Sequence, residues 1–172
     1  MDNRPHIVTY HMRIADLVAT RSTCRRRNVG AVAVKKNRMI ATGYNGAVPG
    51  MAHCSSCLRD DLGIPSGQQL HLCRALHAEQ NLLTQASVFG VSLENSTFYV
   101  TNQPCFTCVK LLVALNPMAV IYRDPYPDDQ TIKFLEDNNW IELSNELDGT
   151  EYHILLPKRS QTPLVQVFRG EL

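Results

Sequence analysis

Two short motifs in the sequence carry residue types that hold metal ions. One is the pattern H-x-E over residues 77–79, and the other is P-C-x-x-C over residues 104–108. An imidazole and two thiolates are common zinc ligands, and three protein ligands leave a fourth position for water. Such an open position is typical of catalytic zinc, whereas structural zinc is enclosed by four protein ligands. We therefore interpret His77, Cys105 and Cys108 as the ligands of a catalytic zinc ion.

Glu79 closely follows the histidine and supplies a carboxyl group that need not bind the metal. It can instead take a proton from a metal-bound water, whose pKa falls to about 7 in suitable sites. Each motif alone is weak, because core histidines are common and zinc knuckles and redox pairs also contain C-x-x-C. Together and in this order, the motifs form the signature of zinc nucleobase deaminases. The pair predicts hydrolytic chemistry with Glu79 as the group that transfers protons.

Both motifs are expected at the starts of helices. Apolar residues recur at helical spacing over 77–89, and Pro104 suits the first turn of a helix through about residue 115 because its missing N–H would be unpaired there. Cys105 and Cys108, three residues apart, then project from one side of that helix. The helix N-terminus favours the thiolate, which is the form that binds metal.

The remaining elements alternate between strands and helices. Residues 7–20 read as a helix, 29–44 as a hairpin around Lys36-Asn37, 97–101 and 119–122 as strands, and 130–138 as a helix before one or two final strands. This order predicts an α/β sandwich with a mixed sheet, and right-handed crossovers favour helices on both of its faces.

Composition sets limits on the class of protein. An apolar content of 44% over 172 residues is enough for one substantial core, so we expect a single domain over residues 1–172. The net charge of +1 argues against binding nucleic acid by bulk electrostatics. No apolar run approaches the roughly 18 residues of a membrane span, and residues 1–13 lack the pattern of a secretory signal. We expect a cytoplasmic protein with neither membrane nor nucleic-acid partners.

The sequence closely resembles the cytidine deaminase superfamily and, within it, the deoxycytidylate (dCMP) deaminases. The segment Gly43-Tyr44-Asn45-Gly46 is what separates the latter from most relatives. The resemblance implies a three-layer α/β/α sandwich with a central mixed five-stranded sheet. It also implies zinc-dependent hydrolysis of dCMP to dUMP and ammonia, which would supply dUMP for thymidylate synthesis. The matching segments are 21–24, 29–32, 42–46, 53–54, 72–74, 77–81, 99–101 and 104–108.

The resemblance also assigns roles to single residues. Glu79 would deprotonate the water, protonate N3 of the pyrimidine and later pass a proton to the departing amine. Asn45 would hydrogen-bond the sugar, although Asn-Gly is equally typical of a turn. Tyr126 would lie near the base, unless it is an exposed turn residue. Arg27, in the run Arg25-Arg26-Arg27 close to Arg21, offers paired donors for a phosphate, and the alternative is a solvated loop.

Four further cysteines accompany an irregular insert at about 45–73. A loop of this length is unusual in a compact domain unless something organises it. In a reducing compartment, six cysteines favour metal binding or catalysis over disulfides. Phage-type relatives carry a second, closed zinc site, so we predict a structural zinc ion here, the alternative being buried thiols. Its expected ligands are Cys24, Cys54, Cys57 and Cys73, with His53 and His71 as substitutes.

Two other functions are compatible with parts of the sequence. Another zinc deaminase, acting on dCTP, 5-methyl-dCMP or tRNA adenosine, could share the motifs. A non-catalytic, zinc-stabilised binding module could also contain the ligands, but it would not need Glu79. Many dCMP deaminases are oligomers, commonly hexamers, activated by dCTP and inhibited by dTTP with Mg²⁺. The resemblance therefore implies a homo-oligomer with these nucleotide effectors.

Overall fold

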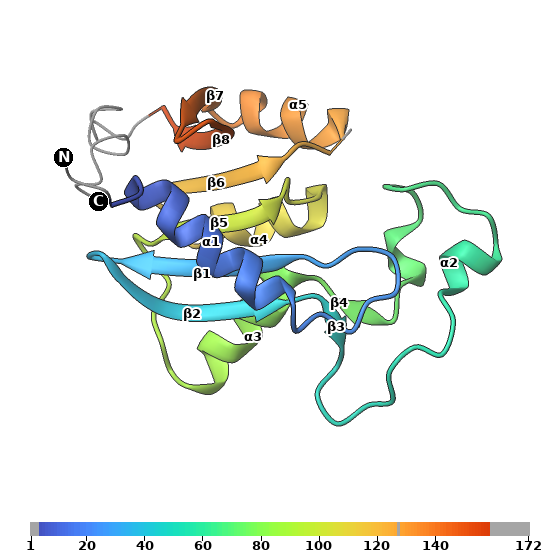
Figure 1. The fold of residues 1–172 in the computed structure, drawn as a ribbon. Helices are drawn as coiled ribbons and strands as arrows, with labels where there is room; N and C mark the ends of the chain where they lie inside the picture. Colours follow the sequence, from blue (N-terminus) through green and yellow to red (C-terminus); the bar gives the residue numbers. More distant parts are fainter. Residues whose placement is uncertain (1–3, 127, 159–172) are drawn as a thin grey trace.

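The computed structural model describes residues 4–126 and 128–158, which fold around a six-stranded mixed sheet (Figure 1). Its strands are β1 (Gly30–Lys35), β2 (Arg38–Tyr44), β5 (Thr97–Asn102), β6 (Ala119–Asp124), β7 (Trp140–Leu147) and β8 (Thr150–Pro157). They lie in the order β2-β1-β5-β6-β8-β7. Only β5 and β6 run parallel among these neighbours, and the other pairs are antiparallel.

Helices cover both faces of the sheet, which confirms the predicted three-layer sandwich. Helix α1 (Ile7–Ala19) packs on one face, and α3 (Ala78–Val88), α4 (Phe106–Ala114) and α5 (Asp129–Asp137) pack on the other (Figure 1). Strand side chains alternate between the two layers because successive residues point to opposite faces. Val32 and Tyr99 contribute to the α1 side, whereas Ala33, Phe98 and Val100 contribute to the other.

The count of five strands implied by the resemblance is wrong by one, because β7 and β8 form a full hairpin at one edge of the sheet. Strands β7 and β8 are joined by Asp148 and Gly149, which both have positive φ. The turn between β1 and β2 has the same feature at Lys36 and Asn37, where the sequence predicted a hairpin. Positive φ at both central residues is the geometry of the two-residue turn that matches strand twist.

The irregular region predicted at about 45–73 forms an insert with two paired ends. Strand β3 (Gly46–Ala47) pairs antiparallel with β4 (Ala75–Leu76), so residues 48–74 leave and return at one place. The insert contains the short helices α2 (Leu58–Asp61) and η1 (Leu70–Leu72). It projects beyond the carboxyl ends of β5 and β6 (Figure 1). In the described ranges, no helix has both the length and the apolar character that crossing a bilayer requires.

Gly43 allows β2 to lie directly against the first turns of α3. A methyl group at Gly43 would overlap the backbone of Ala78 and Leu82. The close approach therefore depends on the missing side chain. Because Glu79 belongs to the first turn of α3, this contact also sets its position.

We predict that Gly43→Ala destabilises the fold more than Gly90→Ala. The first substitution forces α3 away from β2 and should cost about 3 kcal/mol. Gly90 has a φ of 65° but a methyl group there would meet open space, so the cost should be about 1 kcal/mol of backbone strain. Urea denaturation of both variants measures the difference. Equal losses would show that the approach of β2 to α3 is not constrained at this position.

Candidate metal centre and pocket

His77 is held at the junction between the small sheet and α3. It is the N-cap of α3 and directly follows β4. The Gln80 Oε1 atom accepts a 2.9 Å hydrogen bond from the His77 backbone N–H. One turn along, the Asn81 side chain donates to the Tyr44 carbonyl at 2.8 Å. These contacts fix the His77 backbone relative to α3, and α3 relative to β2.

The two cysteines stand at the start of α4, which begins at Phe106, two residues later than the expected start at Pro104. Pro104 lies outside the helix, because Cys105 has extended backbone angles and acts as the N-cap. Cys108 occupies the first turn. The Asp128 carboxylate accepts a 3.0 Å hydrogen bond from the Phe106 N–H, one of the unpaired donors at a helix start. Asp128 therefore anchors the turn that carries both sulfur atoms.

The geometry of the three side chains fits a metal ion. His77 Nδ1 lies 3.4 Å from the Cys105 Sγ and 3.4 Å from the Cys108 Sγ. Two ligands of one tetrahedral zinc stand about 3.5 Å apart, given usual Zn–N and Zn–S distances. Within residues 4–126 and 128–158, this is the one group of three or more possible ligands that lie close enough together. One nitrogen and two sulfur donors also suit zinc chemically.

One thiol of the pair ionises readily, whereas the second ionises only if a nearby positive charge offsets the first thiolate. Its mutual hydrogen bond lowers the pKa of Cys105 to about 4, and the nearby His77 acts in the same direction. The same hydrogen bond raises the pKa of Cys108, and burial and the Glu79 carboxylate raise it further. A divalent cation would offset two thiolate charges at once. The donor set therefore favours a bound metal over two free thiols.

The pKa values of His77 and Glu79 are each set by effects that act in opposite directions. The hydrogen bond between His77 and Cys105 raises the pKa of His77, whereas desolvation and the positive charge of Arg59 lower it. Glu79 is only 4% exposed. Desolvation raises the pKa of its carboxyl to about 7, against the lowering effect of His77. A carboxyl group with such a pKa can hold or release a proton near neutrality.

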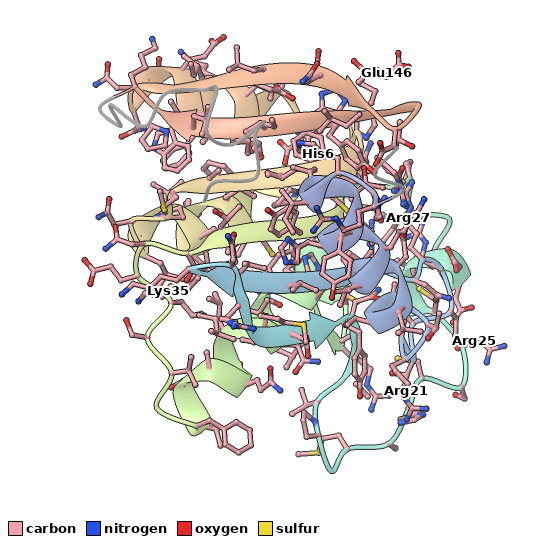
Figure 2. All side chains as sticks on the ribbon, turned by 60° about the vertical axis from the view of Figure 1, so that its left-hand side comes forward. His6, Arg21, Arg25, Arg27, Lys35 and Glu146 are labelled. Atoms are coloured by element: carbon pink, nitrogen blue, oxygen red, sulfur yellow. The ribbon has the colours of Figure 1, made fainter. Side chains whose placement is uncertain are left out.

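A pocket of about 300 Å³ adjoins the cluster and is lined by His77, Glu79 and Cys105. This volume lies within the range of small-molecule sites. Arg27 and Tyr126 line it as well, with the guanidinium of Arg27 above the Tyr126 ring at 5.4 Å from its centroid. Figure 2 shows Arg27 at the end of the molecule that carries the insert, with Lys35 at the opposite end.

Asn45 also lines the pocket, but its side chain is largely engaged by the protein. Its Oδ1 atom accepts hydrogen bonds from the Val29 N–H at 2.8 Å and the Ser22 hydroxyl at 2.7 Å. Its Nδ2 donates to the Arg27 carbonyl at 2.8 Å. Asn45 therefore fixes the loop that presents Arg27. One amide N–H is left for a ligand, since Asn has two.

The four remaining cysteines are not gathered into the predicted four-thiolate site. Cys24, Cys57 and Cys73 line the pocket separately, and no group containing them meets the distance for a shared metal among the described residues. The proposed substitutes His53 and His71 are exposed. Hydrogen bonds and an ion pair hold the insert instead, through Arg26 and Arg59. All six cysteines are unpaired.

Several residues that shape the pocket were not identified from the sequence. Gln103 accepts a 2.8 Å hydrogen bond from the Tyr126 N–H and so positions that ring. Asp128 precedes the helix expected at 130–138, and Asp is a typical N-cap, so its capping role was detectable. The contact of Asp128 with α4 and the location of Arg59 in the pocket wall were not detectable, because both depend on segments distant in sequence.

The sandwich and its His-Cys-Cys cluster at two helix starts define the class: the fold is cytidine deaminase-like, with a zinc-type site. Residues 6–123 match the family described as "Cytidine and deoxycytidylate deaminase zinc-binding region". The chain belongs to this family.

Similar proteins include several named deoxycytidylate deaminase. The one from Saccharomyces cerevisiae is 38% identical over 137 residues, which is 78% of this chain and 43% of that protein. The one from Mycobacterium phage D29 is 40% identical over 125 residues, 70% of this chain and 96% of that protein. Bacillus subtilis ComE operon protein 2 is 40% identical over 119 residues, 68% of this chain and 59% of that protein. The chain thus spans about half the length of the bacterial and yeast relatives.

A solved structure shares the fold and carries ligands. It is the dCMP deaminase of cyanophage S-TIM5 in complex with dCMP and dUMP. The match has a TM-score of 0.65 and 30% sequence identity, and it covers 78% of this chain and 93% of the cyanophage chain.

We predict that Asp128→Ala weakens zinc binding although Asp128 does not contact the cluster. The substitution removes the acceptor for the Phe106 N–H and also the cap of α5, where Asp128 accepts from the Thr131 N–H at 3.2 Å. Loss of such supporting contacts typically lowers metal affinity by about tenfold or more. Competition with a chromophoric chelator measures the dissociation constant. Asp137→Ala is the control, because Asp137 is exposed and pairs only with Lys133 among the described contacts. Equal affinities in the two variants would contradict the prediction.

Proposed function

We propose that this protein is a zinc-dependent deaminase that hydrolyses dCMP to dUMP and ammonia. The observation that carries the proposal is the buried Glu79 carboxyl in one pocket with His77, Cys105 and a cavity of nucleotide-binding size. The names of the yeast and mycobacteriophage relatives support this substrate, as does the cyanophage structure with dCMP and dUMP.

We propose His77, Cys105 and Cys108 as the zinc ligands. A bound zinc ion would supply Lewis acidity and lower the pKa of water to about 7. Glu79 would accept a proton from the attacking water and deliver it to N3 of the pyrimidine. After the C4–O bond has formed, Glu79 would take the second proton from the new C4 hydroxyl and pass it to the amino group as the C4–N bond breaks. Water and the amino group thereby become a carbonyl oxygen and ammonia.

The burial of Glu79 suits this repeated transfer. A carboxyl that is 4% exposed is shielded from bulk water, so a proton that it accepts can be returned to the substrate. Helix α3 fixes the carboxyl beside the ligands through its first turn, and β2 fixes α3 at Gly43. The chain thus supplies a proton carrier that does not need to move far.

Three residues are proposed as substrate contacts because they line the same pocket. Tyr126 would face the base, Asn45 would donate its remaining amide N–H to the sugar, and Arg27 would approach the phosphate. The stacking of Arg27 on Tyr126 places a positive charge beside an aromatic face, which suits a ligand with a ring and an anionic group.

Further properties follow from the family rather than from this geometry. We propose a homo-oligomer, with a hexamer expected, regulated by dCTP and by dTTP with Mg²⁺. A cytoplasmic location is supported by the six unpaired cysteines, since disulfides form in oxidising compartments.

Glu79→Gln should lower the rate of dCMP deamination by about a thousandfold or more, because general acid–base catalysis contributes this order of magnitude. The amide keeps the shape of the side chain but cannot carry the proton. An ultraviolet assay over cytidine, deoxycytidine, CMP, dCMP and dCTP measures both the activity and its preference. The unmodified chain should prefer dCMP.

Zinc content and the far-ultraviolet spectrum are the controls for this variant, and both should match the unmodified chain. Near-normal activity of Glu79→Gln would refute the mechanism. A preference for dCTP or another cytosine compound would refute the substrate but retain the class. No activity on any of the five compounds would favour a zinc-stabilised binding module.

The second, structural zinc ion also stays a proposal, and metal analysis tests it. Three of its four expected ligands line the same pocket wall, and the insert would have to rearrange to bring them within the distance of a shared metal. If a second site forms, the purified protein contains two zinc ions per chain. Cys57→Ser should then lower the content to one, while Ser56→Ala, a neighbouring exposed position, should not. One zinc per chain with four freely alkylated thiols would reject the second site.

A further inference from the structure

Two arginines in the pocket wall come from segments that are distant in sequence. Arg59 belongs to α2 in the insert and is only 8% exposed. Arg26 belongs to the loop before β1, and its side chain is 21% exposed. Both line the pocket that contains His77 and Glu79. A guanidinium is always charged and has five N–H donors, so its burial is costly unless those donors and the charge are compensated.

One turn of the insert holds both guanidinium groups. Arg26 Nη2 donates to the Ile64 carbonyl at 3.2 Å, and Arg59 Nη2 donates to the next carbonyl, Pro65, at 3.1 Å. Arg26 Nε also pairs with Asp60 at 2.8 Å, but that carboxylate is 51% exposed. Two positive charges are therefore fixed beside one turn, and the one carboxylate that pairs with them among the described contacts, Asp60, is half-exposed and pairs with Arg26.

Each arginine has a buried nitrogen without an acceptor. Within the part of the chain that the structure describes, Arg26 Nη1 and Arg59 Nε make no hydrogen bond. An unmade hydrogen bond of a buried charged group is among the more costly defects in a protein. A neutral acceptor would satisfy the nitrogens but leave the excess charge. An anion with several oxygens satisfies both needs, and the guanidinium fork matches phosphate geometry.

The location of the pair restricts which anion could bind. A pocket of about 300 Å³ is at the lower limit of small-molecule sites, so it has room for one ligand. Arg59 is also close enough for its charge to act on His77. Because both arginines and the metal cluster line this one pocket, a single molecule could present an anionic group to the arginines and its other end to the cluster.

We propose that Arg26 and Arg59 together seat the phosphate group of the substrate, so that the insert selects a nucleoside monophosphate over a nucleoside. This inference rests on the proposed deaminase function, because that function supplies a ligand with a base at one end and a phosphate at the other. Arg27 is exposed and lies over Tyr126, so it would approach the same phosphate from the solvent side while Arg26 and Arg59 hold it at the pocket wall. The insert thus contributes a specificity-determining residue, Arg59, that no motif indicates.

The test compares Arg59→Gln with Arg38→Gln, an exposed arginine at the start of β2 outside the pocket. For Arg59→Gln, kcat/KM should fall at least about tenfold on dCMP, as expected for the loss of a charge-assisted hydrogen bond. The value on deoxycytidine should change less than about threefold, because this substrate has no phosphate. Arg59→Lys should recover part of the loss, since it restores the charge without the fork.

A binding measurement gives a readout that does not require turnover. Inorganic phosphate should raise the Tm of the unmodified chain and of Arg38→Gln, because a ligand of the folded state stabilises it. It should raise that of Arg59→Gln much less. If Arg59→Gln does not fold, Arg26→Gln, whose side chain is more exposed, carries both measurements.

Two results would overturn the proposal. One is an equal fall of kcat/KM on dCMP and deoxycytidine in a folded, zinc-loaded variant, which would indicate a structural role. The other is an unchanged Tm response of Arg59→Gln to phosphate. If the unmodified chain deaminates neither compound, the deaminase function fails instead, and the proposed substrate phosphate fails with it. A phosphate response that depends on Arg59 would then show only an anion site.

Discussion

The arrangement of the molecule depends on bringing an imidazole and two thiols within a few ångströms of one another. His77 Nδ1 is 3.4 Å from each sulfur, and one thiol resists ionisation while its neighbour is charged. Such a cluster is stable only if the backbone holds it firmly and a cation balances it. The structure meets the first requirement by letting two helices begin at the same edge of the sheet.

Helix α4 begins at this edge because it connects β5 and β6, which are the parallel pair of the main sheet. Their connection places α4 on the sheet with its first turn at the carboxyl end of β5, and α3 begins beside it after β4. Gly43 permits α3 to approach β2, and Asp128 anchors the start of α4 from the next helix. Neither contact touches the cluster, yet each restricts where one of its ligands lies.

Features that depend on residues close together in sequence could be predicted, whereas contacts between distant residues could not. The cluster, its helices and the first hairpin rest on local spacing and turn chemistry, so they were predictable. The sequence left open whether one or two strands follow the last helix, although Asp148-Gly149 is a strong local turn signal that favours two. The sequence predicts that a metal ion organises the insert. The structure instead shows hydrogen bonds of Arg26 and Arg59 to its turn, and the longer of these joins residues 38 positions apart, which local spacing does not indicate.

The pairing of β3 with β4 has a consequence for how such chains can vary. The two-residue strands bring the ends of the insert together, and the second strand leads directly into His77. Changes in length between the strands are therefore absorbed at the surface, since the entropy of loop closure grows only slowly with length. Related chains could lengthen, shorten or replace this segment without moving the histidine. The part of the pocket wall that the insert forms can therefore change in evolution while the position of the metal-binding histidine is kept.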